Sequence, residues 1–133
     1  MTSLRLHSEP RDVVIISDSV VAITLPDTQQ LQYVTVSAQG LKTDMIQKMD
    51  RYCCGITRYK DRLYITCTDP GEVLVLDLEG KVLHSCGDED LFDSPWYITT
   101  GGDGSLYGSD NSTNIITCLS QKGKTVYSHK VNH

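Results

Sequence analysis

The feature that most constrains this chain is a pattern of short strand-like segments that recurs about every forty residues. It is clearest between Trp96 and Lys130, where apolar alternating segments are separated by polar turns. The same order appears in residues 54–86 and, more loosely, in residues 12–45. Such a repeat must be recognised before single motifs are interpreted, because each unit buries its apolar face only against its neighbours.

The register of the repeat identifies the fold class. The glycines that close the third turn of each unit, Gly40, Gly80 and Gly123, are 40 and 43 residues apart. Within each unit apolar residues alternate with period two, which indicates strands with one face buried against a neighbour. Four strands per forty residues is the period of a β-propeller blade. The sequence therefore predicts an all-β fold of about three four-stranded antiparallel blades, a partial β-propeller with an open ring, at residues 12–46, 53–86 and 96–130 after a lead-in at 1–11.

The units also resemble a known family. The third unit is similar to an NHL-type blade through five short motifs: Asp103-Gly104, Leu106-Tyr107, Asp110-Asn111, Asn114-Ile115 and Gly123. The second unit and the segment Pro95–Ile98 resemble the propeller of tripartite-motif (TRIM) proteins of the invertebrate type. The resemblance implies a substrate- or partner-binding domain in a ubiquitin-ligase or regulatory pathway. It also implies that any ligase activity needs a RING, whose Cys/His spacing is not found in these residues, so we expect no enzyme activity here.

The composition indicates the number of domains and the cellular compartment. The chain has 133 residues, of which 39% are hydrophobic, enough for one domain with a core. No apolar run approaches the ~20 residues of a membrane span, and residues 1–12 have no apolar signal core. The five cysteines show no C-x-x-C spacing, which predicts free thiols in a reducing, cytoplasmic compartment rather than disulfides or a zinc site. The adjacent Cys53–Cys54 pair is the one to test for redox activity.

The predicted binding surface is a set of loops. Chain direction in a propeller places the loops before strand one and between strands two and three on the same face, here at residues 26–30, 47–52, 69–71, 87–95 and 110–113. These loops carry eight acidic residues, against only Lys48 and Arg51. An acidic face favours a protein or basic peptide as the partner, with an ordinary solvated surface as the alternative. The predicted partner-binding residues are Asp50, Arg51, Asp69, Asp88, Glu89, Asp90, Asp93, Asp110 and Asn111. Asp27 is another of the acidic residues in these loops.

Two other functions are weighed against this one. Some NHL propellers bind RNA, but the net charge of −5 and the acidic loops have the wrong sign for contacts with phosphate. A calcium-dependent propeller hydrolase or lactonase would need carboxylate or amide ligands from strand one, and residues 13–16, 54–58 and 96–100 contain none. The acidic run 88–90 lacks the glycine pattern of a calcium loop. We therefore expect no catalytic residue, no metal and no cofactor.

Three blades do not close the usual six-bladed ring. An open stack leaves two apolar blade faces uncovered, a kind of patch that monomers avoid. The sequence thus predicts either missing blades from a longer protein or self-association of this chain.

Overall fold

The computed structural model describes residues 3–68, 70–86 and 93–120, and the backbone of residues 125–130. The described chain is built of strands, with one short 3-10 helix, η1 (Pro26–Thr28). The strands are β1 (Asp12–Ser17), β2 (Val20–Leu25), β3 (Gln30–Ser37), β4 (Gly40–Lys48), β5 (Tyr52–Tyr59), β6 (Arg62–Thr68), β7 (Glu72–Asp77), β8 (Val82–Cys86), β9 (Pro95–Thr100), β10 (Leu106–Asp110), β11 (Ile115–Leu119) and β12 (Thr125–Lys130).

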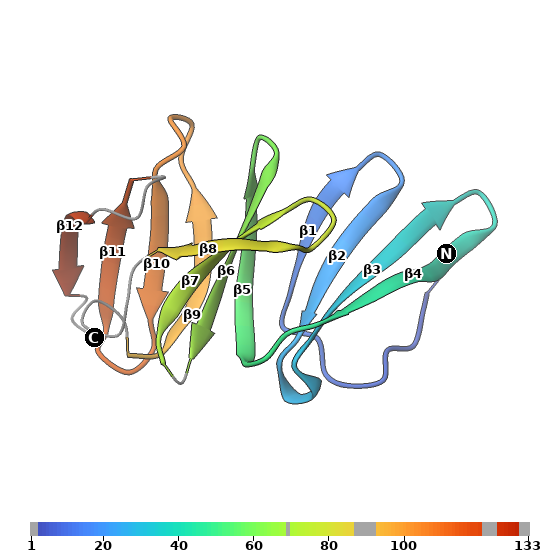
Figure 1. The fold of residues 1–133 in the computed structure, drawn as a ribbon, viewed down its shortest axis with the longest axis horizontal. Helices are drawn as coiled ribbons and strands as arrows, with labels where there is room; N and C mark the ends of the chain where they lie inside the picture. The colour runs from blue at the N-terminus through green and yellow to red at the C-terminus, as the bar shows by residue number, and fades with distance from the viewer. Residues whose placement is uncertain (1–2, 69, 87–92, 121–124, 131–133) are drawn as a thin grey trace.

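The strands form three separate antiparallel sheets of four consecutive strands each, β1 to β4, β5 to β8 and β9 to β12. Figure 1 shows the three sheets side by side along the longest axis, with the sheet of β5 to β8 in the middle. The fold class predicted from the sequence is thus confirmed. The observed strand ends differ from the expected ones by two residues at most, as in β4, which continues to Lys48 rather than ending at Ile46.

Each sheet packs face to face on the next, with its first strand innermost. We call the side of a blade that faces the preceding blade its leading face and the other its trailing face. The first interface joins the trailing face of β1 to β4 with the leading face of β5 to β8, and its core includes Tyr33, Leu63 and Leu76. The second joins the middle blade to β9 to β12 through Val73, Val75, Ile98, Leu106 and Leu119. The middle blade has apolar side chains on both faces, because successive side chains of a strand point to opposite sides of the sheet.

Polar contacts fix the inner strands at the first interface. The Asp12 carboxylate accepts a hydrogen bond from the Ile56 amide at 3.0 Å, and the Thr24 hydroxyl donates to the Cys54 carbonyl at 2.5 Å. The Arg58 guanidinium donates to the carbonyl of Ile16. These bonds satisfy backbone groups that no strand pairing reaches, which sets the position of β5 against β1.

A bulge lets the inner strands of the second and third blades approach closely. The pairing of β5 with β6 jumps between Cys53 and Ile56, and the Gly55 amide bonds the Thr66 hydroxyl at 2.8 Å instead of a backbone carbonyl. A Cβ on Gly55 would lie 2.7 Å from the Trp96 carbonyl oxygen. Glycine is needed there because β9 passes directly over its Cα.

Candidate partner-binding surface

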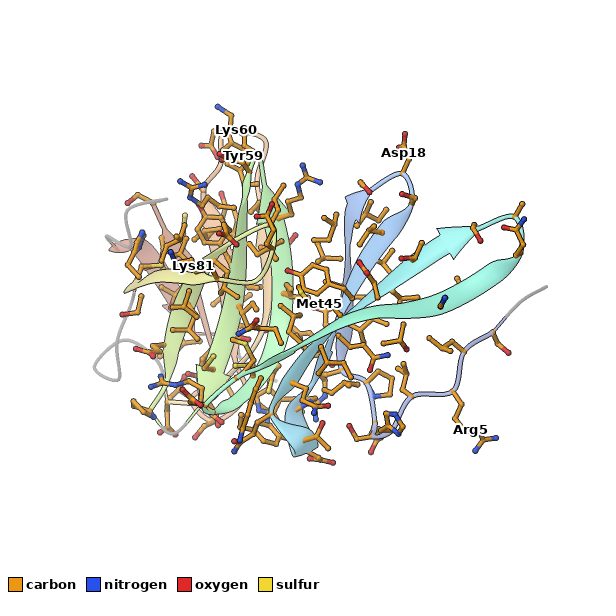
Figure 2. The ribbon with its side chains drawn as sticks, turned by 45° about the vertical axis from the view of Figure 1, so that its right-hand side comes forward. Arg5, Asp18, Met45, Tyr59, Lys60 and Lys81 are labelled. Carbon is orange, nitrogen blue, oxygen red and sulfur yellow. The ribbon has the colours of Figure 1, made fainter. Side chains whose placement is uncertain are left out.

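The described parts of the five loops predicted to share one face, residues 26–30, 47–52, 70–71, 93–95 and 110–113, lie at one end of the molecule. They form the lower end of the molecule in Figure 1, where η1, the β4–β5 connection and the β10–β11 turn are seen at the same level. We call this end the loop face. The turns between β1 and β2 and between β5 and β6, which carry Asp18 and Lys60, lie at the opposite end (Figure 2). The topology of a blade, deduced from strand order alone, thus sorted these turns correctly.

Asp110 does not offer its charge to a partner. It is the last residue of β10 and is buried. One carboxylate oxygen accepts the amides of Asp93 at 2.7 Å and Ser94 at 3.0 Å, and the other accepts those of Ser112 and Thr113, both at 3.0 Å. Asp110 therefore ties the segment before β9 to the β10–β11 turn, and its inclusion among the exposed acidic groups is corrected.

The hydrogen bonds of Asp110 also decide its protonation. Burial of the carboxyl opposes ionisation, but the four backbone N–H donors outweigh it and hold the pKa of Asp110 below its ordinary value. The side chain is therefore an anion at neutral pH whose lone pairs are occupied by amides. Its role in the loop face is to hold two loops together.

The other predicted loop residues differ in availability. Asp50, Asp93 and Asn111 are exposed, as is the neighbouring Asp27. Arg51 is half-buried and forms an ion pair with Glu72 of β7. The remaining predicted residues, Asp69, Asp88, Glu89 and Asp90, lie outside the described residues. Within the described part, the loop face thus presents three exposed aspartates, Asp27, Asp50 and Asp93.

A groove of about 550 Å³ lies between the first and second blades and opens beside Asp50. Its apolar lining comes from Met49, Leu74 and Val82. Its charged lining comes from both blades: Lys48, Asp50, Arg51, Glu79 and Lys81. We call it the interblade groove. Apolar side chains surrounded by charges of both signs are the composition with which proteins bind segments of other proteins.

Local contacts hold the groove open and in place. Met49 is buried, and its amide donates to the Gln29 carbonyl at 2.7 Å, which anchors the β4–β5 connection. The Tyr33 hydroxyl donates to the Leu78 carbonyl at 2.8 Å and so fixes the β7–β8 turn. Burial, with the nearby carboxylates of Asp77 and Glu79, raises the pKa of Tyr33 to about 12, so this donor stays protonated. Figure 1 shows β8 crossing the direction of β5 and β6. The β7–β8 connection supplies Glu79 and Lys81, which line the groove together with Lys48 of β4.

Sequence reasoning found Asp50 and Arg51 of this groove and missed Glu79 and Lys81. Strand order puts the β7–β8 turn at the other end of the blade. The twist of the β7–β8 hairpin changes where this turn lies, and an apolar–polar pattern carries no signal of that twist.

A second, smaller pocket of about 230 Å³ is lined by Trp96, Asn111 and Asn114 beside Asp110. The Asp110 carboxylate there is already bonded to backbone amides, so the pocket offers less charge than the groove.

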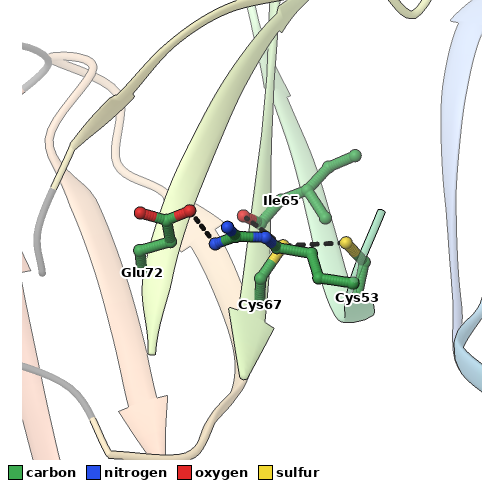
Figure 3. Close-up of polar contacts among 5 residues, drawn as sticks. Cys53, Ile65, Cys67 and Glu72 are labelled. Atoms are coloured by element: carbon green, nitrogen blue, oxygen red, sulfur yellow. Dashed lines mark hydrogen bonds and ion pairs between the residues drawn. The ribbon is translucent and has the colours of Figure 1, made fainter. Parts of the chain in front are cut away.

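The sulfur of Cys53 contacts a cysteine on the adjacent strand. Cys53 lies opposite Cys67 on the adjacent strand, with the two sulfurs 2.8 Å apart, and all five cysteines are free (Figure 3). The contact with Cys53 and burial together raise the pKa of Cys67, and burial raises the pKa of Cys54 and brings that of Cys86 to about 11. These thiols stay protonated at neutral pH, when they are poor nucleophiles.

No group of three His, Cys, Asp or Glu side chains gathers at a metal-binding geometry within the described residues. The innermost carboxylate of the first blade is Asp12, which strand β1 includes and the expected strand of residues 13–16 left out. Its two oxygens accept the amides of Val13 and Ile56. Nor does any described helix have the length and apolar character to cross a membrane.

Comparison with known proteins identifies the architecture. No protein family matches the sequence, and neither does any curated protein. Solved structures do match. Hydrazine synthase of Kuenenia stuttgartiensis is similar at a TM-score of 0.77 and 16% identity, over 98% of this chain and 38% of that one. The WD40 β-propeller domain of Doa1 is similar at a TM-score of 0.72 and 14% identity, over 96% of this chain and 42% of that one. The chain has the fold of three β-propeller blades.

A further propeller-like neighbour is a putative 6-phosphogluconolactonase from Bacteroides fragilis NCTC 9343, with a TM-score of 0.75 and 15% identity, over 94% of this chain and 40% of that one. At such identities the similarity defines the fold and not the activity. The three-blade chain spans about two fifths of the length of these neighbours. These neighbours range from a synthase and a putative lactonase to a WD40 domain, which agrees with the many functions that propellers support.

Proposed function

We propose that this chain is a non-catalytic protein-interaction module that binds an extended segment of a partner protein in the interblade groove. The observation that carries the proposal is the groove itself, because it combines apolar side chains from two blades with exposed charges at its rim. Asp50 at the groove and the exposed Asp27 and Asp93 on the same face favour a segment that contains lysine or arginine. The apolar lining would receive one or two aliphatic or aromatic side chains of that segment.

The charge pattern makes the proposed partner a protein rather than a nucleic acid. Lys48 and Lys81 are the exposed cations of the groove, and they stand beside Asp50 and Glu79 rather than in a continuous basic patch. Arg51 is neutralised by Glu72. Binding to RNA would require several unpaired cations that follow a phosphate backbone. Mixed charges instead suit a peptide with side chains of both polarities.

Within this proposal, the chain belongs to the NHL-type propellers and is similar to those of TRIM proteins, where the propeller selects the partner. The motifs of the third blade, from Asp103-Gly104 to Asn114-Ile115, support this placement. The pathway would then be a ubiquitin or other regulatory pathway in the cytoplasm. Five free, buried cysteines are compatible with such a reducing compartment.

Selection from a displayed library of random peptides tests the proposed function. We expect the chain to enrich peptides that share an apolar residue near a lysine or arginine. Asp50→Lys should weaken binding of such a peptide about tenfold or more, because it replaces attraction by repulsion at the rim of the groove. Titration calorimetry with one enriched peptide measures the effect.

Asp18→Lys is the matched control for that experiment. It makes the same change in charge at an exposed turn on the opposite end of the molecule, so it should leave the affinity unchanged. Enrichment of no common sequence, or equal affinities for the wild-type and Asp50→Lys chains, would contradict the proposal.

A further inference from the structure

The interfaces between blades show which side chains a neighbouring blade covers. On the leading face of the innermost strand, Ile56 of β5 and Ile98 of β9 hold the same position, opposite the middle of the blade's second strand. The preceding blade leaves them only 3% and 7% exposed. Val13 of β1 holds this position in the first blade, where it is 56% exposed. Its neighbour on the same face, Ile15, is also exposed.

The trailing faces follow the same rule. Leu31 of β3 and Val73 of β7 each lie opposite a threonine of the second strand, and the following blade buries both completely. Ile116 of β11 holds the equivalent position, opposite Ser109, and is 43% exposed. At these two positions the side chain is therefore buried where a neighbouring blade is present and exposed at the ends of the stack, in Val13 and Ile116.

The two end faces differ in shape. The trailing face of the third blade has a hollow of about 240 Å³, lined by Tyr97, Thr99, Tyr107 and Ile116 among others. At the first blade the corresponding inner strand instead presents the branched side chains of Val13 and Ile15 on its leading face. In the two interfaces within the chain, a leading face always meets a trailing face. The two uncovered end faces are likewise one leading face, on the first blade, and one trailing face, on the third.

We propose that a second copy of this chain covers both end faces. The trailing face of each copy packs on the leading face of the other, and a two-fold axis closes the six blades into a ring. A head-to-tail contact closes in this way when its rotation divides a full turn. Each copy supplies one face of each kind, so no apolar face stays exposed. Since one chain spans 38–42% of three propeller-like neighbours, two copies together would span 76–84% of their length.

Complementary charge variants test this pairing by analytical ultracentrifugation of the full 133-residue chain. We expect the wild-type chain to sediment at twice 14.8 kDa. Val13→Lys on the leading face and Ile116→Glu on the trailing face should each give a monomer, because every contact between copies in the ring uses one face of each kind. The equivalent residues share a core cluster at both internal interfaces, Ile56 with Leu31 and Ile98 with Val73. An equimolar mixture of the two variants should return to the mass of a dimer. In the mixed ring, one contact joins the new lysine to the new glutamate and the other is unchanged.

Leu83→Lys is the control, since Leu83 is 42% exposed on β8 of the middle blade, which lies at neither end of the stack. It should leave the dimer intact. Circular dichroism checks that each variant is folded, and Ile15→Lys provides a second leading-face variant. A wild-type monomer at all concentrations, an open series of larger assemblies, or a mixture that stays monomeric would overturn the proposal.

Discussion

At the scale of single residues, Asp110 shows how a charged side chain can serve structure rather than binding. Its four amide donors would be left partly unsatisfied by Asp110→Asn, since an amide side chain has only one acceptor oxygen. We expect a loss of about 2 kcal/mol in the free energy of unfolding at pH 7, measured by urea denaturation. Asp93→Asn, which changes an exposed carboxylate in the same loop, should have little effect.

The pH dependence of this loss follows from the lowered pKa of Asp110. A carboxyl whose folded pKa lies below its unfolded value of about 3.8 stabilises the fold above that value, and the stabilisation disappears as the pH falls through the folded pKa. The difference in unfolding free energy between the wild-type and Asp110→Asn chains should therefore shrink below about pH 4. A difference that is constant down to pH 3 would show that the charge is not involved.

The thiols give a second prediction at this scale. All five cysteines are buried, and burial or a neighbouring thiol raises the pKa of Cys54, Cys67 and Cys86. At pH 7 we expect the denatured chain to react with iodoacetamide at all five cysteines, while the native chain stays unmodified over the same time. Mass spectrometry follows both reactions. Rapid modification of Cys53 or Cys54 in the native chain would instead indicate a reactive pair.

At the scale of elements, the close approach of β5 and β9 depends on the bulge at Gly55. Gly55→Ala places a Cβ 2.7 Å from backbone atoms of both Trp96 and Tyr97, which cannot move without shifting β9. We expect a destabilisation of about 2 kcal/mol or more by thermal or chemical denaturation. Gly102→Ala, where a Cβ would meet nothing within 4 Å, should change stability by less than about 0.5 kcal/mol.

The elements also show what could be predicted from the sequence. Alternation such as Leu63, Ile65 and Cys67 in β6 was sufficient to assign strands, and the forty-residue period was sufficient to group them into blades. The bulge at Gly55 could not be predicted, because it accommodates the close approach of β9, which lies about forty residues further along the chain. The burial of Asp110 was missed for the same reason. The sequence of a turn motif is the same whether its aspartate carboxylate faces water or accepts hydrogen bonds from distant amides.

At the scale of the whole molecule, the three blades are equivalent. The two internal interfaces bury the positions that Val13 and Ile116 hold at the two ends, where both are exposed, and the interblade groove arises from one of those interfaces. A closed ring of two copies contains that groove twice. It would therefore present two binding sites to a partner, and a partner with two binding segments would gain affinity from both.

Photocrosslinking from Val13 tests most directly whether a second copy closes the ring. A benzophenone amino acid at this position of β1 would lie on the exposed leading face, and mass spectrometry would locate the residues it captures. A ring of two copies predicts crosslinks to β9, β10 or β11 of another copy, near Tyr97 and Ile116. Crosslinks to β1 or β2 of another copy, or none between copies, would contradict it, because leading faces would then meet each other or nothing.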